Sequence, residues 1–180
     1  MEYAKPQKLP DGRYFLKISG VRHQVNGLVL QGQITGRSVN FKTDSKLFSD
    51  IDEQIVTQAK ASKQEWFGKD LSDDWIQSAY QESVTDGVLD ASLAVQRGEV
   101  ICYAYDVQKN QLAIQDIPEG ATCDAIIELA GLCFLKKSFS PVWRVLQMRV
   151  RGSKPKTPEY LFTDEPEEPT AEEDPADYLD

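Results

Sequence analysis

The chain has 180 residues, with 29 Asp and Glu against 20 Lys and Arg, which gives a formal net charge of −9. This length favours one domain with a tail, and no apolar run reaches the roughly 18 residues of a membrane-spanning helix. The first residues also lack a basic start followed by an apolar stretch, so we expect neither a membrane span nor a signal peptide.

Residues 1–12 contain two prolines and an Asp11-Gly12 turn signal, which predict an irregular lead-in. Period-two alternation then predicts half-buried antiparallel strands at 13–21, 27–34 and 37–43. Apolar residues at helical spacing predict a helix over 45–67, ended by Gly68, and a second helix from Ser72 to Tyr80.

Strands resume at 88–96, 99–107 and 111–115, and two long strands follow at 124–137 and 142–151. In the first long strand, alternation predicts one side made of Ala125, Ile127, Leu129, Cys133 and Leu135, opposite Ile126, Glu128, Leu132, Phe134 and Lys136. In the second, it predicts Leu146, Met148 and Val150 inward, and Trp143, Gln147, Arg149 and Arg151 outward.

Seven or eight strands with helices after the third predict a mainly β (α+β) fold, an OB-like closed or partly open antiparallel barrel. A β-sandwich with a helical insertion is the alternative. The domain would span 13–151, with its helical insert at about 45–80, followed by a linker at 152–163 and an acidic tail at 164–180.

The tail holds nine of the acidic residues and no Lys or Arg, so the rest of the chain has 29 − 9 = 20 acidic and 20 basic side chains. Such a block of like charge repels itself and is typical of a disordered, solvated interaction arm. An anionic arm on a neutral body can occupy a basic groove of its own protein or dock to a basic patch on a partner.

Catalytic and metal sites are poorly supported. His23 is the only histidine, and a surface loop explains it. Asp73-Asp74 falls in the first turn of a predicted helix, where the helix dipole favours acids. Asp124 and Glu128 share one side of a strand without further carboxylates in a matching pattern. We therefore expect no enzyme activity, no catalytic residues, no metal and no cofactor.

Cys102, Cys123 and Cys133 have no C-x-x-C spacing and lie among apolar residues. This pattern is typical of reduced, buried thiols, and it predicts an intracellular chain.

Binding of single-stranded nucleic acid has more support, because several strands place aromatic and cationic residues together. Flat rings stack on bases, and cations follow the phosphates. The same aromatics can also be ordinary packing residues. The alternative function is therefore an acidic-tailed protein-interaction module or a virion structural protein without DNA binding. The candidate DNA-binding residues are Phe15, Lys17, Arg22, Arg37, Lys42, Tyr103, Tyr105, Phe134, Lys136, Lys137, Trp143, Arg144, Arg149 and Arg151.

Three segments, in this order, resemble virus-encoded single-stranded DNA-binding proteins of the short-tailed coliphage type and their counterparts in large nucleocytoplasmic DNA viruses. They are QEWFGKDLS at 64–72, IIELAGLCFLKKSF at 126–139 and VWRVLQ at 142–147. The resemblance implies an OB-fold groove that binds single-stranded DNA without sequence preference, and a role in viral DNA replication, recombination and repair in the host cytoplasm or nucleus.

The resemblance also implies that the acidic tail competes with DNA and recruits a DNA polymerase, a helicase-primase or other replication proteins. Those relatives end in an aromatic residue, whereas Tyr178 is third from last here. The sequence leaves the oligomeric state open, a homodimer included. The expected partner-binding residues of the tail are Asp174, Asp177, Tyr178, Leu179 and Asp180.

Overall fold

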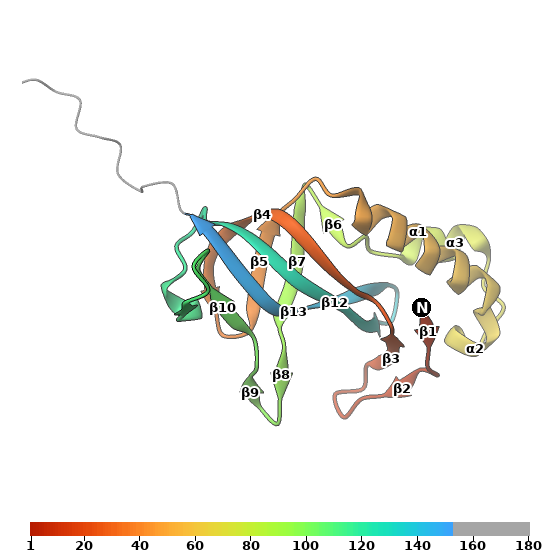
Figure 1. Ribbon diagram of the computed structural model, residues 1–180. Helices are drawn as coiled ribbons and strands as arrows, with labels where there is room; N and C mark the ends of the chain where they lie inside the picture. Colours follow the sequence, from red (N-terminus) through yellow and green to blue (C-terminus); the bar gives the residue numbers. More distant parts are fainter. Residues whose placement is uncertain (153–180) are drawn as a thin grey trace, which may run out of the picture.

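The computed structural model describes residues 1–152, and its centre is a ring of five strands (Figure 1). The alternation of apolar residues along these strands gives the ring one buried side and one solvent-facing side. The ring consists of β4 (Arg22–Thr35), β5 (Ser38–Lys42), β7 (Val88–Leu93), β12 (Thr122–Phe134) and β13 (Phe139–Gly152).

Each ring strand pairs with two neighbours, in the order β12-β4-β5-β7-β13 and back to β12. All these pairings are antiparallel except that of β7 with β13. If the ring strands are numbered 1 to 5 along the chain, the order is 1-2-3-5-4-1, a Greek-key arrangement of the OB type. The predicted fold class, a mainly β OB-like barrel with a helical insert, is confirmed.

Three helices lie between β5 and β7 in the sequence and gather on one side of the molecule (Figure 1). Ser45 and Ser72 cap the first and the third, because their hydroxyls accept the Leu47 and Trp75 backbone N–H. The single helix predicted over 45–67 breaks at Ser62, and Gly68 ends it in the left-handed conformation. The helices are α1 (Lys46–Ala61), α2 (Lys63–Phe67) and α3 (Asp73–Ala79).

Short strands extend the ring at its edges. The predicted irregular lead-in is wrong in part, because β1 and β2 both pair with β3. A hairpin of β8 and β9 forms a small sheet of its own and projects from the barrel (Figure 1). These elements are β1 (Glu2–Tyr3), β2 (Gln7–Lys8), β3 (Tyr14–Ser19), β6 (Val84–Thr85), β8 (Val95–Gln96), β9 (Glu99–Val100), β10 (Tyr103–Tyr105), β11 (Gln111–Leu112) and the 3-10 turn Ile114–Asp116.

An extra residue on β12 reverses the side-chain alternation near its end. Leu129 pairs with Trp143 and Gly131 with Val142, so Ala130 is unmatched on the partner strand. Beyond this bulge Phe134 turns into the core, where it stacks on Phe139, and Leu135 is 52% exposed. The predicted facing of this end of the strand is therefore wrong.

A second irregularity, on β13, has the same effect on Trp143. Ile126 pairs with Gln147 and Ile127 with Val145, so Leu146 is the extra residue. Trp143 consequently points inward with 2% exposure and packs edge-on against Phe48. Its predicted outward facing is wrong, whereas Arg149 and Arg151 do face outward.

The cysteines are free thiols, and two of them are buried. Burial raises the pKa of Cys102 to about 12 and that of Cys123 to about 11, so both stay protonated at neutral pH. Cys133 is partly exposed. Within residues 1–152, no helix is both long and apolar enough to cross a membrane.

Candidate nucleic-acid interface

Four neighbouring strands present the candidate interface on the outer side of the barrel. Across the sheet they follow the order β4, β12, β13 and β10. Their inward positions hold core residues such as Ala104, Ala125 and Val145, so the alternate positions face solvent. We call this outward set the tyrosine–arginine face, and it consists of Arg22, Tyr103, Tyr105, Arg144, Arg149 and Arg151.

Two tyrosines lie on the same side of β10. Tyr103 is 48% exposed and Tyr105 is half-buried, while Ala104 between them points into the core. Residues two apart on a strand are separated by about 7 Å. β10 runs parallel to β13, with Tyr103 opposite Gln147 and Tyr105 opposite Arg149. Both rings therefore lie at the surface beside the polar side chains of β13.

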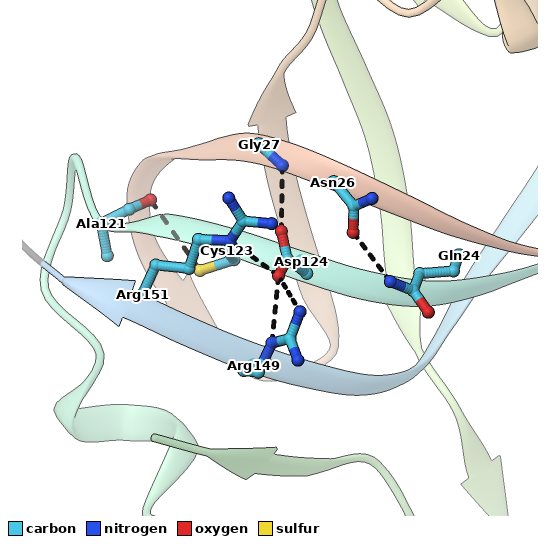
Figure 2. A network of polar contacts seen from close by, with 8 residues as sticks. All are labelled: Gln24, Asn26, Gly27, Ala121, Cys123, Asp124, Arg149 and Arg151. Carbon is cyan, nitrogen blue, oxygen red and sulfur yellow. Dashed lines mark hydrogen bonds and ion pairs between the residues drawn. The ribbon is translucent and has the colours of Figure 1, made fainter. Parts of the chain in front are cut away.

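Arg149 and Arg151 converge on one buried carboxylate, that of Asp124 (Figure 2). Arg149 donates from Nε and Nη2 to Oδ2 of Asp124 at 3.0 and 2.6 Å, and Arg151 donates from Nε to the same oxygen at 2.8 Å. The Asp124 side chain is 4% exposed, whereas about half of each arginine side chain is exposed. Both guanidinium groups are therefore held at the surface with N–H groups to spare.

A bulge in β4 supplies the third contact of this carboxylate. Cys123 pairs with Leu28 and Ala125 with Val25, which leaves an extra residue on β4 opposite Asp124. Gly27 has a φ of 73° there, and its N–H donates to Oδ1 of Asp124 at 3.2 Å. The bulge thus turns a backbone donor toward the carboxylate that holds the two arginines.

The electrostatics of this cluster favour an anionic ligand. Burial alone would raise the pKa of Asp124, but hydrogen bonds from Arg151, Arg149 and the Gly27 N–H outweigh it and hold that pKa below its usual range. Asp124 is therefore ionised at neutral pH. Two guanidinium groups against one carboxylate leave the cluster with a net charge of +1.

Further cations continue along the same outer wall. Arg22 on β4 and Arg144 on β13 are the two cross-strand neighbours of Glu128 on β12. Arg22 Nη2 lies 3.5 Å from Glu128 Oε1. Lys17 pairs with Gly131 on β3, the next step along β12. The row of cations therefore runs along β12 from Gly131, opposite Lys17, to Thr122, opposite Gly152 and next to Arg151. These nine steps along the strand correspond to roughly 30 Å.

A hollow of about 190 Å³ is lined by Tyr105 and by residues of β4, β12 and β13. Gln24, Gln147 and Arg149 line it together with Lys109, which belongs to the turn after β10. Lys109 and Asp124 are functional candidates that the sequence analysis missed. The sequence suggests Asp124 only as a metal ligand, because the pairing that places it directly opposite Arg149 is not visible along a single strand.

The remaining predicted residues do not join this face. Phe134 and Trp143 are buried, so the prediction that bases stack on them is wrong. Phe15 shares the outward side of β3 with Lys17, beyond the tyrosine–arginine face, and its ring occupies the space of the missing side chain of Gly131. Arg37 lies in the turn between β4 and β5, Lys42 ends β5, and Lys136 and Lys137 lie in the turn between β12 and β13. The predicted tail residues Asp174, Asp177, Tyr178, Leu179 and Asp180 are outside the described residues.

The wall formed by β5 and β7 is a second surface of the barrel, and OB-folds often bind oligonucleotides on this pair of strands. Its polar positions include Ser38, Asn40, Asp90 and Ser92, and Trp143 lies beneath it. No aromatic residue faces outward from β5 or β7, and Phe41 points into the core. The ring of Trp143 lines hollows in this wall but is only 2% exposed, so β5 and β7 offer no exposed ring for a base to stack on.

The solved structures similar to this chain include three of a single-stranded DNA-binding protein from bacteriophage Enc34. The protein itself is 11% identical, with a TM-score of 0.48, over 90% of this chain and 97% of the other. Its C-terminal truncation is 12% identical, with a TM-score of 0.49, over 86% and 97% of the two chains. Its complex with single-stranded DNA is 14% identical, with a TM-score of 0.46, over 84% and 96%.

Structural similarity this weak does not indicate a shared function, so a function can be proposed only from the residues of this chain. No curated protein matches the sequence. A family profile does match it, over residues 26–164, which is most of the barrel. The chain therefore belongs to the family of unknown function DUF5871.

Proposed function

We propose that this chain binds single-stranded DNA without sequence preference on the tyrosine–arginine face. The observation that carries the proposal is the placement of two outward tyrosines on β10 directly beside the arginines that Asp124 holds on β13. Base-stacking rings and phosphate-binding cations are the two components that single-strand binding needs. Here adjacent strands of a rigid barrel bring them together.

Each component has a distinct role in the proposed mechanism. An unpaired base stacks on the exposed ring of Tyr103 or Tyr105, which contributes about 1–3 kcal/mol per base and hardly depends on the base. The planar guanidinium groups of Arg149 and Arg151 donate to phosphate oxygens. Bases in a duplex are already stacked on their neighbours, so the tyrosines favour the single strand.

The acidic tail regulates this interface in our proposal. Its nine carboxylates follow a body with equal numbers of acidic and basic residues. β13 ends at Gly152, directly after Arg151, and residue 164 is 12 positions further along the chain. That length can reach about 40 Å at most, so the tail is close enough to compete with DNA for the arginines.

The proposed setting is DNA replication, recombination and repair of a virus, as the resemblance of 64–72, 126–139 and 142–147 implies. The chain would coat exposed strands without catalysing a reaction, and the tail would recruit replication proteins such as a polymerase or a helicase-primase. A chain that only recruits proteins through its acidic tail would need no tyrosine–arginine face.

Fluorescence anisotropy with labelled oligo-dT tests the proposal on the full-length protein, across a salt series and with or without Mg²⁺. We expect affinity that falls steeply with salt, needs no Mg²⁺ and exceeds the affinity for a duplex of equal length. Absence of binding to oligo-dT would favour a protein-interaction module. Mg²⁺-dependent cleavage of the probe would indicate an enzyme.

A further inference from the structure

Three residues other than glycine have a positive φ among residues 1–152: Asp86 at 52°, Arg97 at 52° and Lys109 at 70°. Side chains with a Cβ are disfavoured in this left-handed region, and only Asn and Asp visit it readily. Asp86 is such a residue. Arg97 and Lys109 are long cations at positions where a glycine or an asparagine would make the turn more stable.

Arg97 stands in the two-residue turn that joins β8 to β9. Arg97 and Gly98 both have positive φ, as in a type I′ turn, whose most favourable sequence is Asn-Gly. The side chain of Arg37, from the turn between β4 and β5, donates from Nη2 to the carbonyl oxygen of Gly98 at 3.3 Å. A second cation therefore lies against the same turn.

Lys109 stands in the turn that joins β10 to β11. Its backbone N–H donates to the carbonyl of Asp106 at 3.1 Å, and the Asp106 N–H donates to the carbonyl of Asn110 at 2.9 Å. Hairpin turns of this kind place one residue in the left-handed region, where glycine is usual. Lys109 also lines the hollow beside Tyr105 and Arg149, so it belongs to the surface of the proposed interface.

These two turns are the first upstream and downstream of the strand that carries both tyrosines. The chain runs from the Arg97 turn through β9 into β10, and from β10 directly into the Lys109 turn. Figure 1 shows the β8–β9 hairpin projecting from the barrel on the side of β10. A strand of DNA that stacks on Tyr103 and Tyr105 therefore has one of these cations in the turn at either end of its path.

We propose that Arg97 and Lys109 are phosphate-binding residues that extend the interface beyond both ends of β10, retained although each lowers the stability of its turn. The inference rests on the proposed function, because it assigns these residues to the same interface. A positive charge that served only solubility could stand at any exposed position with an ordinary φ.

The test replaces each cation by the residue that its turn favours. Arg97→Asn creates an Asn-Gly turn, and we expect its melting temperature to rise by about 2–4 °C. We expect its affinity for oligo-dT to fall about fivefold at about 0.1 M salt, with a slope against log salt shallower by about 0.7, as for one lost phosphate contact. The double variant Arg97→Asn, Lys109→Asn should lose about 1.4 from that slope.

Two controls separate charge from conformation. Arg97→Lys keeps the cation and the strained φ, so the slope against log salt and the melting temperature should both stay near those of the unaltered chain. Asp86→Asn changes the type I′-like turn between β6 and β7, away from β10, and should leave DNA affinity unchanged.

The outcomes distinguish this inference from the function on which it rests. If the unaltered chain does not bind oligo-dT, the proposed function fails and the inference falls with it. If that chain binds and the asparagine variants bind as tightly with the same salt slope, the phosphate contacts are refuted while the proposed function stands. If the asparagine variants are no more stable than the unaltered chain, Arg97 and Lys109 do not lower the stability of their turns, and that part of the inference is refuted.

Discussion

Asp124 determines where two arginines of the face lie. It is a carboxylate with almost no exposed surface, and its donors are Arg149 and Arg151 of β13 and the backbone N–H of Gly27 in the bulge of β4. An arginine on an open strand would lose considerable rotamer freedom when it binds phosphate. Arg149 and Arg151 have already lost part of that freedom on folding, so Asp124 prepares the cationic part of the face.

Asp124→Asn tests this role through stability and pH. The pKa of Asp124 is lowered by folding, so its ionised form stabilises the protein above the unfolded value of about 3.9, and this contribution disappears as pH falls through the folded pKa. We expect the substitution to lower the free energy of unfolding by about 1–3 kcal/mol at neutral pH. The difference from the unaltered chain should shrink below about pH 4 in urea titrations. A difference that does not depend on pH would contradict this role.

Tyr103 offers the most direct test of stacking, because its exposed ring contributes little to the core. Tyr103→Ala should weaken oligo-dT binding by about 1–3 kcal/mol, and should change the free energy of unfolding by no more than about 0.5 kcal/mol. Tyr103→Phe should retain most of the affinity. Tyr14 on β3 is a matched control, since it is 47% exposed and lies outside the face. Equal losses in Tyr103→Ala and Tyr14→Ala would argue against a stacking site on β10.

At the scale of the elements, β12 and β13 show how far sequence patterns reach. Their alternation predicted the strands themselves, and it placed Arg149 and Arg151 outward correctly. It failed for Phe134 and Trp143, because each lies beyond an extra residue that reverses the facing of its strand. A bulge is defined by the register with a partner strand, and a pattern along one strand contains no information about that register.

Gly131 shows what the close approach of β3 to β12 requires. A Cβ at this position would collide with the carbonyl oxygen of Leu16 and with the ring of Phe15. Gly131→Ala should therefore lower the free energy of unfolding by about 1–3 kcal/mol, as overpacking does. Chemical denaturation measures this loss. Unchanged stability would mean that β3 does not pack as closely on β12 as the structure shows.

At the scale of the whole molecule, the candidate site is assembled from distant parts of the chain. Arg22, Tyr103 and Arg149 belong to β4, β10 and β13, which share one wall only because β12 pairs with both β4 and β13 and so closes the barrel. The sequence could nominate aromatic and cationic residues, but it could not show which of them share a wall. Lys42 and Lys136 are equally plausible in the sequence, but Lys42 lies at the end of β5 and Lys136 lies in the turn between β12 and β13.

Removal of residues 164–180 tests the proposed competition by the tail. The deletion changes the net charge from −9 to 0, since it removes nine acidic residues and no basic ones. We expect tighter binding to oligo-dT, with the largest gain at low salt, where charge interactions are least screened. A tail of unchanged length with Asn and Gln in place of Asp and Glu should behave like the deletion. Equal affinity of all three proteins at every salt concentration would exclude competition by the tail.

The central claim is that DNA lies on the wall of β10 and β13 and not on that of β5 and β7. Amide chemical-shift mapping of the full-length protein during an oligo-dT titration tests it most directly. We predict that the largest shifts will cluster at 101–109 and 144–151, with smaller ones near residue 22. Shifts concentrated at 38–42 and 88–92, with none on β10, would contradict the account.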